Sequence, residues 1–370
     1  MTTEAKENGG TKPLTGLLKL TEEACFAMSD FVQKVYKRLT DDRKMMTTKA
    51  DNSFFTIADS LVQLMTQTLY PLDKFKEFCG EESQKNINVA KRPYSIDGLP
   101  VPDDIADSFD KVFKDISAIA AQISSTQYKD IGIFVDPIDG TREFCNGKGE
   151  QCSICIGFTR DEVPVAGIVF RPIPLSPGGK LTYMSGAKEE GYKHGELDLV
   201  EGAPASILTT NGSISQFTKN LMEELKYERT KAGGCGNKMM LLLEGKGTAY
   251  IQDRGVSRWD TCAAQAVIEA CGGVLCKLSV VESTGKLESY HYRVGDKNLD
   301  FNEGAMFTKY NIRDKSLLKQ DPPPKISEEL VQPYSNLCGI FAVKAQDDKL
   351  IASLTKAIQD ISKTSKPEYS

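Results

Sequence analysis

The segment of residues 134–141, which reads FVDPIDGT, constrains this chain more than any other. The apolar run that leads into it, residues 131–135, has the length and composition of a buried strand. Asp136 is therefore expected at the carboxyl end of that strand. Pro137 is expected to end the strand, because proline has no backbone donor and a fixed φ.

Oxygen atoms are expected to gather in the turn that follows. The carboxylates of Asp136 and Asp139 and the carbonyl of Ile138 can converge on one point, and two like charges held together favour a cation between them. Carboxylate and carbonyl oxygens are the ligands that Mg²⁺ prefers. Gly140 lets a ligand approach the backbone, and a helix beginning at Thr141 would offer free N–H groups to an anion. The segment predicts a metal and phosphate site, with an Asx-rich β-turn as the alternative.

Carboxylates elsewhere in the chain strengthen this interpretation. Glu81 lies in a G-E-E sequence, and Asp59 lies early in a helix predicted over residues 51–69. Asp260 opens an apolar helix that ends at the glycine pair 272–273. Taken singly, Asp59 is an ordinary solvated acid and Asp260 a helix cap. Their order and flanking residues together are more specific than any one of them.

Composition argues against several other kinds of site and partner. His194 and His291 are the only histidines and lie outside the acidic motifs, which disfavours a Ser–His–Asp hydrolase or a His-ligated zinc site. Ten cysteines are scattered along the chain, and the C-x-x-C pair of Cys152 and Cys155 lies in an apolar run, so buried thiols are expected. A net charge of −5 without a basic face disfavours a nucleic-acid polymer as partner.

Location is predicted from what the sequence lacks. No apolar run approaches the roughly 20 residues that a membrane helix needs. Residues 1–10 have the character of neither a signal peptide nor a transit peptide. We therefore expect a cytoplasmic protein that does not bind membranes.

The rest of the chain predicts alternating helices and strands, and so a mixed α/β protein. Helices are expected over residues 14–40, 51–69 and 216–225, between residues 104 and 128, and from residues 237 and 260 onward; strands are expected over 131–135, 152–158, 163–170, 181–184, 207–210 and 248–252. The Pro- and Gly-rich residues 90–104 indicate a surface insertion within residues 85–130. Three prolines at 322–324 precede a C-terminal segment whose polar end, residues 363–370, is expected to be flexible.

The motifs together resemble those of the lithium-sensitive, magnesium-dependent phosphomonoesterases, which include inositol monophosphatase, inositol polyphosphate 1-phosphatase and 3′(2′),5′-bisphosphate nucleotidase. The sequences DPIDGTREF (136–144), GGCGNK (233–238) and RWDTCA (258–263) are most similar to the bisphosphate nucleotidases. The resemblance covers residues 15–310. It implies a layered α/β/α/β/α sandwich, with an N-terminal lobe (1–195) that carries the main metal site, a C-terminal lobe (196–320) that closes it, and a C-terminal extension (321–370).

The resemblance also implies a role for individual residues. It assigns roughly two to three Mg²⁺ ions to Glu81, Asp136, the Ile138 carbonyl, Asp139 and Asp260, the activation of water to Asp59 and Thr141, and substrate or phosphate contacts to Gly140, Thr141, Asn211, Gly234 and Lys238. The implied substrate is a small bisphosphate, namely adenosine 3′,5′-bisphosphate, which would be hydrolysed to AMP and phosphate. Lithium is the implied inhibitor.

The chain departs from the nucleotidase pattern after the strand that ends at Thr210. Nucleotidases usually continue with T-R-S-H, whereas this chain has Asn211, Gly212, Ser213 and Ile214. Asn211 can still form hydrogen bonds, but Ile214 cannot replace the histidine. Inositol polyphosphate 1-phosphatase, acting on inositol 1,4-bisphosphate, therefore stays an alternative.

Two further alternatives are weaker. Fructose-1,6-bisphosphatase matches poorly outside the metal motifs. A non-catalytic family member that only binds its ligand is disfavoured by the complete set of acids together with Thr141.

Overall fold

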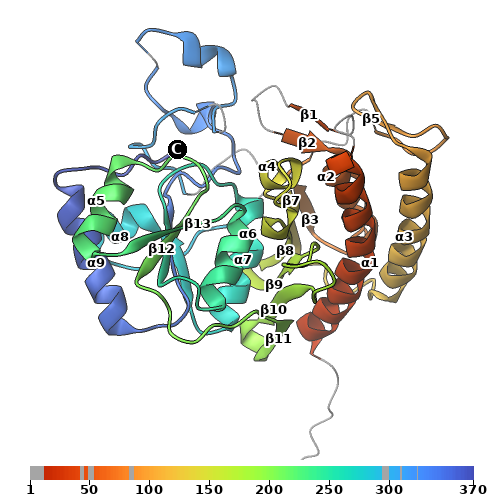
Figure 1. The fold of residues 1–370 in the computed structure, drawn as a ribbon, viewed down its shortest axis with the longest axis horizontal. Helices are drawn as coiled ribbons and strands as arrows, with labels where there is room; N and C mark the ends of the chain where they lie inside the picture. Colours follow the sequence, from red (N-terminus) through yellow and green to blue (C-terminus); the bar gives the residue numbers. More distant parts are fainter. Residues whose placement is uncertain are drawn as a thin grey trace, which may run out of the picture.

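Helices alternate with two sheets in five layers (Figure 1). The structure is a computed structural model that describes residues 12–41, 46–48, 54–82, 87–293, 300–308, 311–322 and 324–370. One outer layer holds α1 (Pro13–Asp41), α2 (Ile57–Leu69) and α3 (Asp103–Gln122); the middle layer holds α6 (Cys235–Leu243) and α7 (Arg258–Ala270); the other outer layer holds α5 (Gln216–Leu225), α8 (Leu278–Thr284) and α9 (Asp348–Ser362). The expected α/β/α/β/α sandwich is confirmed.

The first large sheet has six strands in the order β11-β10-β9-β8-β7-β3. Its strands are β3 (Glu77–Gly80), β7 (Gly132–Asp139), β8 (Ser153–Arg160), β9 (Val163–Arg171), β10 (Thr182–Ala187) and β11 (Tyr192–Glu196). β3 and β7 are parallel, and the remaining pairs are antiparallel. The predicted β8–β9 hairpin and its continuation are therefore confirmed.

The second sheet has five strands in the order β13-β12-β14-β16-β15. Its strands are β12 (Ser206–Thr209), β13 (Glu228–Lys231), β14 (Ala249–Gln252), β15 (Val274–Lys277) and β16 (Ile340–Val343). Two small sheets complete the structure: β1 (Met46–Thr48) with β2 (Phe54–Thr56), and β4 (Ile87–Asn88) with β5 (Ser95–Ile96) and β6 (Leu99–Pro100). Short 3₁₀ turns occur at Gly149–Gln151, Lys188–Glu190, Lys315–Lys319 and Glu328–Leu330.

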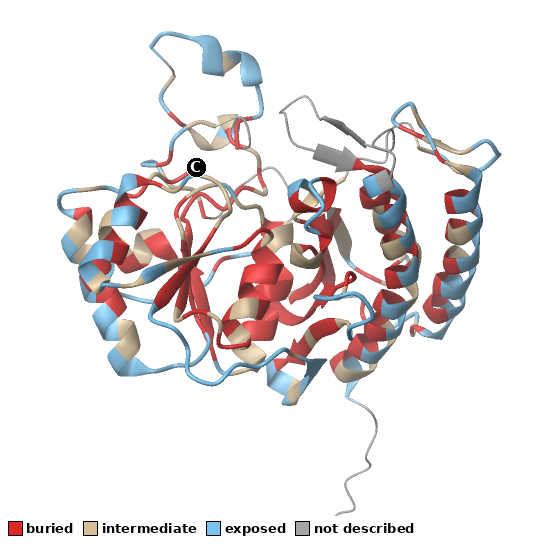
Figure 2. Ribbon diagram, in the orientation of Figure 1, coloured by how far each residue is buried: buried red, intermediate tan, exposed pale blue. Residues whose placement is uncertain are grey.

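The middle helix layer is buried on both sides (Figure 2), and α7 packs against the six-stranded sheet. Glycines in the sheet permit this close packing. A Cβ atom on Gly157 would lie 2.6 Å from the Ala263 nitrogen, and one on Gly167 would lie 2.8 Å from the Ala263 oxygen. The sheet and the start of α7 are thereby held close enough to share one site.

Two predictions about the ends of helices and strands near the site were wrong. The helix predicted over residues 51–69 begins only at Ile57, because Thr56 caps it and residues 54–56 form β2; residues 51–53 lie outside the described part of the chain. Pro137 does not end its strand, since β7 continues to Asp139 through an irregular pairing between Asp136 and Asp139. A bulge leaves a residue without a ladder partner and so tolerates a proline.

The predicted insertion around residues 85–130 is only partly peripheral. α3 packs against α1 and α2, and its apolar face, including Ile105, Phe109 and Ile116, joins the core. The small β4–β6 sheet accounts for the Pro- and Gly-rich part of the insertion.

The C-terminal segment contributes a strand to the five-stranded sheet. β16 lies between β14 and β15 in the five-stranded sheet. The polar end that was expected to be flexible is packed down: Tyr369 is 6% exposed, its hydroxyl donates to Glu282 at 2.9 Å, and the Gly255 N–H donates to the Ser370 carbonyl at 2.9 Å. Buried residues and polar contacts thus anchor a tail that looks polar in sequence.

Two further expectations concern thiols and membranes. All ten cysteines are free, and all but Cys271 are buried. The helices of the described ranges include none with the length and apolar character that crossing a bilayer requires.

Candidate active site

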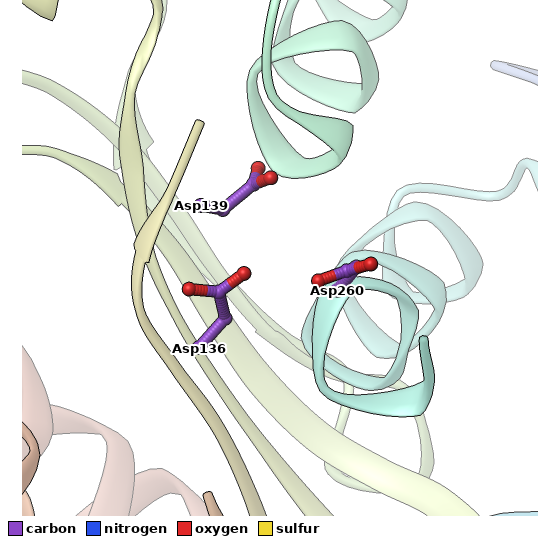
Figure 3. Close-up of side chains that lie close together, drawn as sticks. All are labelled: Asp136, Asp139 and Asp260. Carbon is purple, nitrogen blue, oxygen red and sulfur yellow. The ribbon is translucent and has the colours of Figure 1, made fainter. Parts of the chain in front are cut away.

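Three carboxylates face one another between the six-stranded sheet and α7. Asp136 and Asp139 lie at the end of β7, and Asp260 lies in the first turn of α7 (Figure 3). One oxygen atom from each carboxylate lies within 4.8 Å of the others. Asp136 and Asp139 are buried, and Asp260 is half-buried. Such a group of oxygen atoms fits a hard cation.

The Asp139 carboxylate is fixed by the start of α6. Its two oxygens accept hydrogen bonds from the N–H groups of Cys235 at 2.8 Å and Gly236 at 2.6 Å, and the Ser153 hydroxyl donates to it at 3.0 Å. Gly234, which precedes α6, has φ +64°, and a Cβ atom there would lie 3.0 Å from Asp139 Oδ2. Glycine at this position lets the helix end reach the carboxylate.

Asp260 is held by its own helix. Its carboxylate accepts a hydrogen bond from the Ser257 N–H at 2.7 Å, and the two residues form a capping box at the start of α7. A capping box uses hydrogen-bond donors of the helix end that otherwise lack partners. The predicted capping role and the predicted place beside the other carboxylates are thus both fulfilled by one side chain.

The three carboxyl groups repel one another, and burial removes the water that would stabilise their negative charges. Burial raises the pKa of Asp136 well above its usual range, and the charges of Glu81, Asp139 and Asp260 raise it further. Burial, with the charge of Asp139, raises the pKa of Asp260 to about 7. Burial also raises the pKa of Asp139, although Lys238 and the α6 N–H groups act in the opposite direction. A bound cation would relieve this repulsion.

A second pair, Asp59 and Thr141, lies beside the cluster. The Thr141 hydroxyl lies 3.0 Å from Asp59 Oδ1 and 3.0 Å from the Ile138 carbonyl. The other Asp59 oxygen accepts from the N–H and the hydroxyl of Thr56 at 2.9 and 2.5 Å. Asp59 is fully buried. One oxygen of Asp59 is therefore committed to the helix cap, and the other faces Thr141.

Gly140 and Asn211 connect the site to the second lobe. Gly140 has φ +94°, and a Cβ atom on it would lie 3.4 Å from the Gly234 backbone. The Asn211 amide donates to Glu143 Oε1 at 3.0 Å and to Gln151 Oε1 at 2.8 Å. Both amide hydrogens of Asn211 are used in this way, and Asn211 itself is not among the residues that line the cavity of about 470 Å³ described below.

Lys238, an expected substrate contact, is buried rather than open to a cavity. It is 4% exposed, and its Nζ atom lies 5.2 Å from the centre of the Tyr250 ring. Its charge acts on Asp139. The structure thus places Lys238 behind the carboxylates.

A cavity of about 470 Å³ opens beside α4 (Thr141–Cys145). Its wall includes Arg142, Ile214, Ile251, Arg254 and Met306. Sequence reasoning assigned no role to Arg142, Glu143, Gln151 or Ser153. Arg142 and Glu143 lie inside the DPIDGTREF motif, which could have drawn attention to them; Gln151 and Ser153 have no comparable signal.

The geometry agrees with a comparison against known families. A model of the inositol monophosphatase family matches residues 14–298. The chain belongs to this family. The resemblance of its acidic motifs to that superfamily is thereby confirmed.

The proteins that are similar to this chain in sequence include nucleotidases. The chain is 27% identical over 184 residues to human 3′(2′),5′-bisphosphate nucleotidase 1, covering 48% of this chain and 58% of the human protein. It is 30% identical over 203 residues to the 3′(2′),5′-bisphosphate nucleotidase CysQ of Buchnera aphidicola, covering 52% of this chain and 75% of that protein. The chain spans between half and three fifths of the length of the mammalian relatives that it matches.

Solved structures share the fold. The extragenic suppressor protein SuhB of Bartonella henselae superposes with a TM-score of 0.53 at 12% identity, covering 93% of this chain and 98% of SuhB. An IMPase of Thermotoga maritima superposes with a TM-score of 0.52 at 15% identity, covering 94% and 99% of the two chains. At these identities the likeness concerns architecture alone.

Proposed function

We propose that this family member is a Mg²⁺-dependent phosphomonoesterase that hydrolyses the 3′-phosphate of adenosine 3′,5′-bisphosphate to AMP and phosphate. The observation that carries the proposal is the trio of facing carboxylates, Asp136, Asp139 and Asp260, beside the Asp59–Thr141 pair. Family membership supports the reaction class, and the names of the nucleotidase relatives support the nucleotide.

The carboxylate cluster fits the metal that this proposal needs. Asp136, Asp139 and Asp260 would hold Mg²⁺ together with Glu81 and the Ile138 carbonyl, because all of these donors are oxygen atoms. Bound Mg²⁺ would supply positive charge against the phosphate and would acidify a water molecule.

The chain's own residues would position and deprotonate the attacking water. The Thr141 hydroxyl would pass its proton to Asp59 Oδ1, which lies 3.0 Å away, while its oxygen takes a proton from the water. The water oxygen would then form a bond to phosphorus as the ester P–O bond breaks, and the leaving oxygen would take a proton from solvent. The N–H groups of Gly140 and Thr141 would hold the phosphate.

One observation keeps a second substrate in play. Ile214 lines the cavity, and it stands at the position of the histidine in the T-R-S-H sequence of the nucleotidases. An apolar side chain there is compatible with inositol 1,4-bisphosphate, which has no base to recognise. We propose the nucleotide rather than the inositol bisphosphate as the substrate, because the matching relatives are named nucleotidases.

Location is part of the proposal. Ten cysteines without a disulfide suit a reducing compartment, and we propose that the protein acts in the cytoplasm.

A phosphate-release assay tests the proposed function. The purified protein would be offered adenosine 3′,5′-bisphosphate, inositol 1,4-bisphosphate and fructose 1,6-bisphosphate, each with Mg²⁺, with excess EDTA, and with Mg²⁺ plus millimolar lithium. We expect turnover of the nucleotide that requires Mg²⁺ and is inhibited by lithium. Turnover that survives EDTA would refute metal dependence, and a clear preference for the inositol substrate would refute the nucleotide assignment alone.

A further inference from the structure

Three arginines lie in or behind the wall of the cavity beside α4, and their partners differ. Arg229 supports the loop that follows β12: it donates to the Thr209 hydroxyl at 2.8 Å and to the carbonyls of Thr210 at 2.7 Å and Gly212 at 2.6 Å. Its guanidinium is occupied by the protein itself. Arg229 therefore shapes the wall.

Arg254 lines the cavity, but its charge is already matched. It forms an ion pair with Glu368 of the C-terminal segment. The Glu368 N–H in turn donates to the Asp253 carboxylate at 2.9 Å, so the pair is tied to the end of β14. Arg254 and Glu368 together add no net charge to the cavity.

Arg142 differs from both. It is exposed and lines the same cavity. Within the described ranges its guanidinium has no carboxylate within ion-pair distance and no hydrogen-bond acceptor. Its Nη1 atom lies 3.7 Å from the position that a Cβ atom on Gly212 would take. Among the described residues, Arg142 therefore brings to the cavity wall a positive charge without a direct counter-ion, and the remaining acidic side chain of the wall, that of Asp253, accepts from the Glu368 N–H instead.

The register of α4 explains this placement. Successive helical residues point about 100° apart. Thr141 faces Asp59 and the Ile138 carbonyl, whereas Glu143 is buried and accepts from Asn211. Arg142, between them, points into the cavity. A ligand that reacts at Thr141 and extends into the cavity would thus pass Arg142.

The rest of the wall suits the organic part of a small ligand. Ile214, Ile251 and Met306 give it an apolar surface. Its volume of about 470 Å³ lies in the range of small-molecule sites. Met306 and Glu368 lie beyond residue 298, where the match to the family model ends. The C-terminal segment therefore contributes to the wall of this cavity.

We infer that Arg142 is a specificity-determining residue that binds the non-reacting phosphate of the substrate. The inference rests on the proposed function and deepens it, because it assigns the second phosphate of a bisphosphate to one side chain. Guanidinium groups bind phosphate oxygens in a bidentate manner, and such charge-assisted hydrogen bonds are stronger than neutral ones. A substrate without the second phosphate would leave Arg142 without this partner.

Two substrates that share the reacting bond test the inference. Adenosine 3′,5′-bisphosphate and adenosine 3′-monophosphate would be compared with the wild type, Arg142→Gln, Arg142→Lys, and the double variant Arg254→Gln/Glu368→Gln. We expect Arg142→Gln to lose about ten-fold in kcat/KM for the bisphosphate through KM, and to stay within about two-fold of wild type for the monophosphate. Arg142→Lys should recover part of the loss. The double variant removes an arginine from the same cavity without changing the net charge, and should leave the substrate ratio unchanged.

A binding measurement separates this inference from the proposed function. AMP carries only the non-reacting 5′-phosphate, and calorimetric titration of AMP needs no turnover. We expect Arg142→Gln to bind AMP about ten-fold more weakly than wild type. If neither nucleotide is hydrolysed, the proposed function fails and the AMP titration still decides the role of Arg142. An equal Kd for wild type and Arg142→Gln, no binding of AMP to the wild type, or an equal loss in the double variant would overturn the inference.

Discussion

The two ends of α6 carry buried charges that are arranged in opposite ways. At its C-terminal end Arg171 donates to Glu244 at 2.6 Å, and both side chains are 0% exposed. Arg171 also donates to the Asn237 side chain at 2.9 Å. At the N-terminal end, Asp139 binds the helix and faces Asp136 and Asp260, which carry the same charge. One end is closed by its own counter-charge, and the other collects repelling charges.

This difference separates a charge pair that is neutralised within the protein from a group of carboxylates that is not. A buried charge is costly unless a partner of opposite charge and hydrogen bonds compensate it. The Arg171–Glu244 pair meets both conditions within the protein. In the carboxylate cluster the pKa of Asp136 is raised by burial and by its acidic neighbours, so the protein itself does not meet them. A bound cation would supply the missing opposite charge, and variants of each end should behave accordingly.

The largest effect is expected from Asp136→Asn. This change removes a ligand oxygen charge from the centre of the cluster, and we expect kcat/KM to fall by about 10³-fold or more at saturating Mg²⁺. The stability of the metal-free protein should not fall, because one of the mutually repelling charges is lost. Turnover and thermal melting in EDTA and in Mg²⁺ measure both quantities, and the rise in Tm on adding Mg²⁺ should shrink. Wild-type turnover in this variant would show that the carboxylates at the N-terminal end of α6 are not needed for catalysis.

At the C-terminal end of α6, Glu244→Gln should lower the free energy of unfolding. The change leaves the Arg171 guanidinium buried without its carboxylate, which costs about 3–5 kcal/mol when a buried pair is broken. Urea denaturation measures the loss. Asp130→Asn is the matched control, because Asp130 pairs with Arg160 at 2.6 Å but its side chain is 56% exposed; it should cost less than about 1 kcal/mol. Equal losses in the two variants would show that burial does not set the strength of these pairs.

Thr141→Ala tests an uncharged residue beside the cluster, whose hydroxyl contacts Asp59 and the Ile138 carbonyl. Loss of the hydroxyl should reduce kcat by about 10²-fold, the lower range for general acid–base catalysis, while Thr141→Ser retains most activity. The Mg²⁺ dependence of the remaining turnover should be unchanged, since the carboxylates are intact. A matching loss in Thr141→Ser would instead assign the effect to the packing of the threonine methyl group.

The sequence predicted the carboxylate end of α6 better than the other end. Asp136, Asp139 and Asp260 lie in short motifs whose residue types state their chemistry, and the structure brings the three together. The Arg171–Glu244 pair is separated by 73 positions and has no motif, so only the fold reveals it. The same holds for the bonds from Asn211 to Glu143 and Gln151, which depend on two lobes meeting.

Two of the wrong predictions about the fold have a common physical cause, whereas the late start of α2 is set by the local capping box of Thr56 and Asp59. Pro137 reads as a strand terminator, yet an irregular pairing in β7 accommodates it. Residues 363–370 read as a flexible tail, yet Tyr369 finds a buried place on the second lobe and β16 completes its sheet. In each case a contact distant in sequence overrides a correct local preference, and no local pattern contains that information.

The smallest effect is expected from Ile214→His, which tests the outer part of the site. Ile214 lines the cavity but has no polar group, so the present site lacks one hydrogen bond that a nucleotide base or sugar could accept or donate. One such bond is worth on the order of 1 kcal/mol, or several-fold in kcat/KM. We expect Ile214→His to raise kcat/KM for adenosine 3′,5′-bisphosphate relative to inositol 1,4-bisphosphate by that amount, and Ile214→Leu to leave the ratio unchanged. Because the change is read as a ratio between two substrates of the same variant, a loss of folded protein cancels. A ratio that stays constant in Ile214→His would show that the side chain at position 214 makes no polar contact with the nucleotide, and the preference would then depend on the apolar wall.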